Sequence, residues 1–462
     1  MLPDDVLFEI FEFRLLERQR VEEWITLSHV CRRWRSVVFH SPRRLNLRLL
    51  CTPKTRTRDI LNIWPPLPLI ISDFDDHNDF DDHNDFHVGP SRSSSVGNII
   101  TALEHNNRVC QIFLRSSRFG YVTESAVMRK PFPELTDLQL GIDGDGPGPR
   151  LSNSFLGGTA PRLRSLRLSN VQFPGLPKLL LSSTHLVHLD LSFIPLSGYI
   201  PPEVMATTLS ALTSLESLLL QFRCPRPRPT LEIGRPRPLT RPILPDLTKI
   251  RFKGTSEYLE EILARIDAPR LDEMRITFFN QIIFDTPQLF QFIDRRSILR
   301  APKKGYIIFN SEAIIIEFPS ETSANHVLSV EIPCTASEWQ LSSIEQVCTS
   351  LPPVFTLEGL CIFEGQLPPP VWQDDVENTL WLELLRSFVA LKNLYLSVNF
   401  ARRIAPALQE LVGEGGTTDV LPTLENIFLK GHQLSGPLHK GIEDFVAARR
   451  VANHPVAISR WV

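Results

Sequence analysis

The segment Leu186-Val187-His188-Leu189-Asp190-Leu191-Ser192 determines the fold class of this chain. Its leucines follow the order apolar-x-x-apolar-x-apolar, which places the last two on the same side of an extended strand. The same order recurs along most of the sequence, which indicates an internal repeat. The copies are Val109–Leu114, Leu135–Leu140, Leu163–Leu168, Leu186–Leu191, Leu215–Leu220, Leu247–Phe252, Leu271–Ile276, Leu357–Ile362, Leu391–Leu396 and Leu424–Leu429.

The spacing of the copies predicts a strand, a turn and a helix in each unit. Neighbouring copies lie 23 residues apart between Leu163 and Leu186 and 34 residues apart between Leu357 and Leu391. Apolar residues at helical spacing lie between several of the copies. Such a unit buries its apolar face only against its neighbours, so the repeats predict one continuous core. The expected helices are 258–266, 340–348, 378–388 and 442–451.

The repeat resembles a degenerate leucine-rich repeat. Two copies are sharper, because Leu186–Leu191 is followed by Leu196-Ser197-Gly198-x-Ile200-Pro201 and Leu424–Leu429 by Leu434-Ser435-Gly436-Pro437. The resemblance implies an irregular α/β solenoid with parallel strands over residues 49–462. Between Ile276 and Leu357 the pattern gives way to β-rich runs at 306–309, 313–318 and 327–332. The alternative is an unrelated α/β domain with leucine-rich strands.

The first fifty residues have a different, helical pattern. Val6, Leu7, Ile10 and Phe11 form an apolar stripe, and Pro3-Asp4-Asp5 before them is typical of a helix start. A second stripe at helical spacing runs from residue 27 to residue 38, with arginines on the opposite face. So few residues cannot bury this apolar surface on themselves. The stripes therefore pack on the following domain or form a partner interface.

Leu2-Pro3-x-Asp5-Val6-Leu7-x-x-Ile10-Phe11, followed by Leu27-x-x-Val30-Cys31-x-x-Trp34-Arg35, resembles an F-box. The continuation Phe39-x-Ser41-Pro42-Arg43-Arg44-Leu45 is similar to F-box proteins of mushroom-type fungi. The resemblance implies a helical domain at 1–48 that docks on the Skp-family adaptor of cullin–RING ubiquitin ligases. The adaptor-binding residues implied are Leu2, Pro3, Val6, Leu7, Ile10, Phe11, Leu27, Val30, Cys31 and Trp34.

The composition excludes several other classes of protein. The 462 residues include 49 Lys and Arg against 52 Asp and Glu, a net charge of −3 that gives no reason to expect a nucleic acid or an anionic membrane as partner. The 7 cysteines are scattered without a C-x-x-C pair, which argues against a disulfide framework and a zinc module. With neither a secretory signal nor a membrane-spanning run recognised, we expect a cytoplasmic or nuclear protein.

Two insertions interrupt the repeats. Residues 73–97 begin with a duplicated Asp-Phe-Asp-Asp-His-Asn and are expected to form an acidic loop. Its His83 and His87 leave transition-metal binding as an alternative, but we expect no metal. Residues 223–242 are rich in Arg-Pro steps and are expected to form an extended loop, with an acidic partner as the alternative.

No catalytic motif is present, since the sequence lacks G-x-S-x-G, H-E-x-x-H and a Walker A lysine loop. We therefore expect neither an enzyme nor a cofactor. The leading hypothesis is the substrate-recognition subunit of a Skp/cullin/F-box ubiquitin ligase, which acts by holding a target near the ligase. An adaptor-binding scaffold outside ubiquitin transfer is the alternative, and an intrinsic hydrolase is a third.

The residues between the last two apolar positions of each copy face the concave side of a leucine-rich solenoid. On that side we predict a target-binding strip with cations at Arg251, Lys253 and Arg275 and apolar anchors at Tyr395 and Phe428. Cations on neighbouring strands repel one another unless an anion bridges them, so the strip predicts a target with an acidic or phosphorylated segment. Alternatively, the cations pair with a nearby acid such as Glu273, or are simply solvated.

Overall fold

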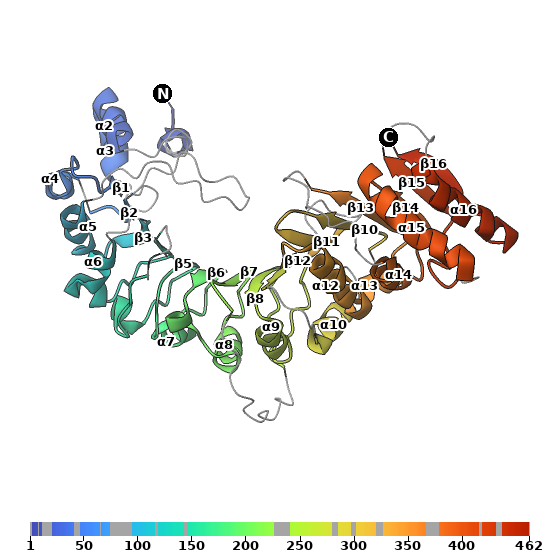
Figure 1. The fold of residues 1–462 in the computed structure, drawn as a ribbon. Coiled ribbons are helices and arrows are strands. Elements are labelled where there is room, and N and C mark those ends of the chain that lie inside the picture. The colour runs from blue at the N-terminus through green and yellow to red at the C-terminus, as the bar shows by residue number, and fades with distance from the viewer. Residues whose placement is uncertain are drawn as a thin grey trace. The chain divides into compact units, whose positions relative to one another are not determined.

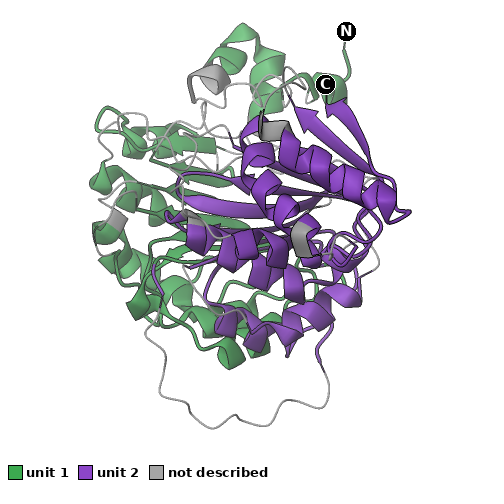
Figure 2. Ribbon diagram, turned by 45° about the vertical axis from the view of Figure 1, so that its right-hand side comes forward, with its two compact units in different colours: residues 1–223, 244–246 green, residues 224–243, 247–462 purple. Residues whose placement is uncertain are grey.

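A computed structural model gives the structure of the chain, which divides into two compact units (Figure 2). The first unit consists of residues 1–223 and 244–246, and the second of residues 224–243 and 247–462. The described residues are 2–7, 9–11, 21–40, 47–64, 66–73, 95–115, 119–142, 146, 148–225, 241–279, 285–296, 302–319, 327–365, 378–414, 418–430 and 437–461.

The N-terminal region is helical, as predicted. Residues 4–7 and 9–11 are helical and are followed by α2 (Val21–Val30) and α3 (Arg32–His40). The sequence predicted one continuous helix through Cys31, but the structure breaks it at that residue. Cys31 lies between the two helices and precedes α3: its carbonyl accepts from the amide of Arg35 at 3.0 Å, and its sulfur accepts from the amide of Trp34 at 3.4 Å. The helical spacing of the apolar residues persists across this one-residue break, so spacing alone does not reveal it.

The rest of the first unit is a parallel sheet whose strands follow chain order. Its helices lie along one side of the sheet, as Figure 1 shows. The strands are β1 (Leu47–Leu50), β2 (Leu69–Ser72), β3 (Val109–Leu114), β4 (Asp137–Gly141), β5 (Ser165–Ser169), β6 (His188–Ile194) and β7 (Ser217–Phe222). The helices are α4 (Thr57–Ile63), α5 (Val96–Leu103), α6 (Phe119–Glu124), α7 (Leu176–Ser182) and α8 (Pro202–Leu209), with 3₁₀ turns at Ala126–Arg129, Phe155–Gly158 and Leu196–Gly198.

The repeated leucines stack in register. Leu166 on β5 is aligned with Leu138 on β4 and with Leu189 on β6, and all three are at most 1% exposed. The first leucine of each copy ends a turn that leads into the strand: the amides of Leu163, Leu186 and Leu215 each donate to the carbonyl three residues earlier at 3.1 Å. The turn and the buried strand residues together explain the order apolar-x-x-apolar-x-apolar.

The second unit has the same design with one irregularity. The strand order is β8-β9-β12-β11-β10-β13-β14-β15-β16, and helices lie along one side of these strands as well (Figure 1). The strands are β8 (Lys249–Gly254), β9 (Glu273–Phe278), β10 (Lys304–Phe309), β11 (Ala313–Pro319), β12 (Val327–Pro333), β13 (Gly359–Glu364), β14 (Asn393–Leu396), β15 (Asn426–Lys430) and β16 (Ala457–Trp461). The helices are α9 (Ser256–Leu263), α10 (Pro287–Asp294), α12 (Ser337–Ser350), α13 (Pro352–Phe355), α14 (Asn378–Arg386), α15 (Val398–Glu414) and α16 (Pro437–Val451).

The irregularity is the region where the sequence pattern gives way. All three predicted β-rich runs are strands, but β11 is antiparallel to both β10 and β12, whereas β12 is parallel to β9 and β10 is parallel to β13. The strands β10, β11 and β12 form an insertion in the repeat array. Buried Gln340 of α12 contacts the ends of this insertion, because its amide donates to the carbonyls of Asn310 at 2.9 Å and Cys334 at 2.6 Å. The ladder of strands therefore continues through the insertion with one strand reversed.

Both predicted loops lie largely outside the described residues. Residues 74–94 of the Asp/His segment and 226–240 of the Arg/Pro segment are not among them, so the predictions for these loops remain untested. Where the structure is described, no helix has the length and apolar character needed to cross a membrane. Nor does any group of His, Cys, Asp or Glu in those ranges meet the requirements of a metal site.

Candidate protein-binding surfaces

The ten residues implied as adaptor-binding divide into two sets. The first set is exposed or partly exposed: Leu2 is 51% exposed, Ile10 42% and Val30 56%. Val6, Pro3 and Cys31 are exposed as well. Val6 and Ile10 are one helical turn apart and share a face. Because apolar side chains gathered on a small helical domain are costly in water, this set suits a partner interface.

The second set packs inside the helical domain. Leu7, Phe11 and Leu27 are buried, and Trp34 is half-buried with its ring edge-on to Phe11, the ring centroids 4.8 Å apart. These four positions therefore support the helices from within. Whether any of the ten residues contacts an adaptor stays a prediction, but the structure assigns surface positions to only part of the set.

Arg33 fastens the N-terminal segment to α3. Its Nη2 atom lies 2.6 Å from Oδ1 of Asp4 and donates to the carbonyl of Leu2 at 2.6 Å. The aspartate is near the start of the first helical residues, where a negative charge is also favourable for the helix dipole. This contact holds Leu2 and Asp4 beside α3.

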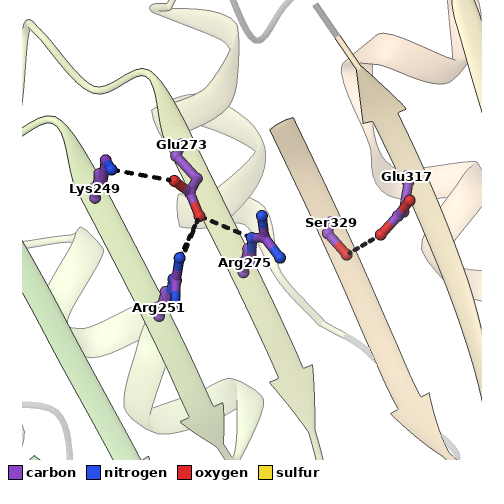
Figure 3. A network of polar contacts seen from close by, with 6 residues as sticks. All are labelled: Lys249, Arg251, Glu273, Arg275, Glu317 and Ser329. Carbon is purple, nitrogen blue, oxygen red and sulfur yellow. Dashed lines mark hydrogen bonds and ion pairs between the residues drawn. The ribbon is translucent and has the colours of Figure 1, made fainter. Parts of the chain in front are cut away.

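A second candidate surface lies on the face of the second unit's sheet opposite its helices, which we call the open face. It carries a basic cluster of Lys249, Arg251 and Arg275 around Glu273 (Figure 3). Arg251 and Arg275 are directly opposite each other on β8 and β9. Both donate to Oε1 of Glu273, at 3.2 Å and 2.8 Å, and Lys249 lies 4.0 Å from Oε2.

The sequence left open that the predicted cations pair with Glu273. The structure shows this pairing for Arg251 and Arg275. Glu273 is 5% exposed at its side chain, whereas the three cations are 32% to 48% exposed. One carboxylate against three cations leaves an excess of two positive charges facing solvent. The terminal nitrogens of Arg275 lie on the far side of its guanidinium from Glu273 (Figure 3). Lys253, aligned with Thr277, adds a cation that forms no ion pair with the described residues.

Acidic side chains follow the basic cluster on the inserted strands. Glu317 on β11 accepts from the hydroxyl of Ser329 at 3.4 Å, and Glu331 on β12 accepts from Thr277 at 2.9 Å. A hydroxyl group carries no charge, so neither contact pairs the carboxylate with a cation. The sequence analysis missed these residues, although the alternation of β11, with Glu317 between buried Ile316 and Phe318, marks it as a strand position on the open face.

Aromatic rings cover the C-terminal end of the open face. The predicted anchors Tyr395 and Phe428 are aligned on β14 and β15 and stack with centroids 4.4 Å apart and an interplanar angle of 9°. Trp461 on β16 meets Tyr395 edge-on at 5.6 Å, and the ammonium of Lys430 lies 5.3 Å from the Trp461 ring centroid. The sequence analysis missed Trp461 because no copy of the repeat pattern covers β16.

Cys361 of β13 is aligned with Tyr306 of β10 on one side and with Tyr395 of β14 on the other. Burial raises the pKa of its thiol to about 11, and Lys304 opposes that shift in part. The thiol is therefore neutral at physiological pH and is a weak nucleophile.

Comparisons with known proteins agree with the helical N-terminus. Residues 1–48 match the model of the F-box-like family, so the chain carries an F-box-like domain at its N-terminus. A search of curated proteins finds no match. Among solved structures, the leucine-rich repeat-containing protein LegL7 from Legionella pneumophila aligns over 87% of this chain and 97% of its own, with 12% sequence identity and a TM-score of 0.26. The chain thus combines an F-box-like domain with a mixed α/β array of mostly parallel strands built on a leucine-rich pattern.

Proposed function

We propose that this protein is a substrate-recognition subunit of a Skp/cullin/F-box ubiquitin ligase. The observation that carries the proposal is the F-box-like domain at residues 1–48, whose surface keeps the apolar side chains of Leu2, Val6, Ile10 and Val30 exposed. F-box domains generally bind Skp-type adaptors, and an adaptor would cover this surface. The similarity of 39–45 to mushroom-type fungal F-box proteins belongs to the same proposal.

The repeat array then binds the target protein. Its open face offers an excess of positive charge around Arg251 and Arg275 and an aromatic cluster at Tyr395 and Phe428. Guanidinium groups suit carboxylates and phosphates, so the target carries an acidic or phosphorylated segment. Such a receptor works by proximity and needs no catalytic group of its own. Its site of action is the cytoplasm, the nucleus or both.

Reconstitution tests the proposal. The full chain is immobilised and incubated with a recombinant Skp-family adaptor and a cullin, together and separately. We expect the chain to retain the adaptor directly and the cullin only when the adaptor is present. Failure to retain the adaptor contradicts the proposal.

The second candidate function is a scaffold that binds the adaptor but takes no part in ubiquitin transfer. The exposed F-box surface supports it equally, since that surface concerns the adaptor alone. The same reconstitution separates the two functions, because the scaffold retains the adaptor without the cullin.

A further inference from the structure

We propose that the open face of the second unit recognises an extended target segment with three chemically different positions in a fixed order: an acidic or phosphorylated residue, a basic residue and a large apolar residue. This inference rests on the proposed function, since it describes the target that the repeat array would hold. All residues concerned belong to one compact unit.

One row of side chains crosses the whole open face. Successive register pairs connect β8 with β16 without a gap, so these residues form a line perpendicular to the strands. In order, the row is Arg251, Arg275, Ser329, Glu317, Tyr306, Cys361, Tyr395, Phe428 and Ser459. The row therefore begins with cations, continues through a carboxylate and ends in aromatic rings.

The basic end is prepared for an anion. Oε1 of Glu273 holds both arginines, because it accepts from Nε and Nη2 of Arg251 and from Nε of Arg275. Nη1 of Arg251 and both terminal nitrogens of Arg275 have no partner among the described residues. Two guanidinium groups held side by side with excess positive charge match a phosphate or carboxylate. The internal anion reduces their repulsion without neutralising them.

The middle of the row has the opposite sign. Glu317 lies two strands beyond Arg275, and Glu331 lies beside it in the neighbouring row, aligned with Thr277 and Ile315. Neither carboxylate forms an ion pair with the described residues; their hydrogen-bond partners are the hydroxyls of Ser329 and Thr277. An acidic residue at this position would be repelled, whereas a lysine or arginine would be attracted.

The apolar end of the row suits a different kind of side chain. Tyr395 and Phe428 stack on each other, Trp461 meets Tyr395 edge-on, and Lys430 lies over the Trp461 ring. Such a group of rings suits an aliphatic or aromatic side chain, and Lys430 disfavours a second cation. The apolar character continues toward the middle through Ile308 and Phe363, which are aligned in the adjacent row.

Strand spacing sets the length of the segment. Arg275 and Tyr395 are five strands apart, which corresponds to about 24 Å at about 4.8 Å per strand. An extended chain advances about 3.3 Å per residue, so the acidic and apolar positions are about seven residues apart. Glu317, two strands from Arg275, places the basic residue about three residues from the acidic one, on the side of the apolar position.

Fluorescence anisotropy with synthetic peptides tests this order. The full chain, bound to its adaptor, is titrated with labelled peptides that carry phosphoserine at one end, Leu-Phe at the other and a Gly-Ser spacer of varied length. We expect the tightest binding with a separation of about seven residues, and at least about tenfold weaker binding at a separation of three, because only one anchor then reaches its site. Affinity that does not depend on the separation overturns the inference.

Reversing the charge of Glu317, in the middle of the row, provides the second part of the experiment. With lysine three residues after the phosphoserine, Glu317→Lys should weaken binding, and with glutamate at that position the same variant should bind more tightly than the wild type. Arg402→Glu on α15, an exposed charge reversal away from the open face, should change neither affinity. If Glu317→Lys leaves the preference unchanged, the middle site does not exist. Retention of the adaptor in the same preparation shows that a negative peptide result concerns this inference and not the proposed function.

Discussion

Arg251 and Arg275 share one oxygen atom, Oε1 of Glu273, with donor distances of 3.2 Å from Nη2 and 2.8 Å from Nε. The two arginines are directly opposite on neighbouring parallel strands, where like charges repel. The protein supplies its own bridging anion, so the basic cluster exists before any partner binds. The charge that remains in excess is available to a target.

Removing this anion should destabilise the second unit. Glu273→Gln keeps the shape of the side chain but leaves two partly buried guanidinium groups facing each other. We expect the free energy of unfolding to fall by about 1–3 kcal/mol, the range for an interrupted charged hydrogen-bond network. Urea denaturation followed by circular dichroism measures the change.

Lys249→Met provides the matched control, because Lys249 is 48% exposed and 4.0 Å from Glu273. Such an exposed pair contributes at most about 1 kcal/mol, so this variant should remain near the wild type. A Glu273→Gln protein as stable as the wild type would show that solvent already screens the two arginines.

The two sets of F-box residues should respond differently to substitution. Phe11→Ala removes a fully buried ring that touches Trp34 and should destabilise the helical domain by about 3–5 kcal/mol. Val6→Ala shortens an exposed side chain and should leave the domain folded. Hydrogen exchange of α2 and α3 distinguishes these outcomes, and equal protection in the two variants would contradict the assignment of Phe11 to the interior.

The sequence contained most of the fold because the repeat is local. Each copy of the pattern contains the leucines that form its own turn and strand. Strands such as β5 and β6 could therefore be predicted from a few leucines. The inserted strands could be recognised as strands, but their neighbours could not be predicted. Pairing of β12 with β9 and of β10 with β13 depends on contacts between distant segments, which no local pattern encodes.

The candidate surfaces were predicted less completely for the same reason. Glu273 could be named as an alternative partner of the cations because it lies two residues before Arg275. Glu317 could not be placed between Arg275 and Tyr395 without knowing the strand order. In the F-box, one apolar stripe contains both Val6 and Leu7, and only packing reveals that Leu7 is the buried one.

Trp461 should stabilise the edge of the second unit. Trp461→Ala removes its contact with Tyr395 and the cation–π contact with Lys430. Together these contacts contribute about 1–2 kcal/mol, so amide protection of β16 should fall while that of β13 is retained. Trp339→Ala on α12, where the ring is 49% exposed, is the control. Unchanged amide hydrogen exchange of β16 in Trp461→Ala would contradict a stabilising role for the contacts of Trp461 with Tyr395 and Lys430.

The reactivity of Cys361 should increase steeply with pH. Because the pKa of its thiol is raised to about 11, the thiolate fraction grows about tenfold per pH unit up to that value. Iodoacetamide labelling between pH 7 and pH 10, followed by mass spectrometry of the Cys361 peptide, measures the increase. Exposed Cys31 reports whether the reagent is active at each pH. Rapid labelling of Cys361 at pH 7 would mean that the site is open and its thiolate stabilised.

Isothermal titration of the full chain with a Skp-family adaptor tests the central claim most directly. Ile10 is 42% exposed on the proposed docking surface, and Ile10→Asp should weaken binding by about 2–4 kcal/mol, which is typical of a central apolar anchor. Arg275→Glu, on the open face of the second unit, should bind the adaptor as the wild type does. This account predicts that pattern, and an Ile10→Asp protein that binds the adaptor with undiminished affinity would contradict it.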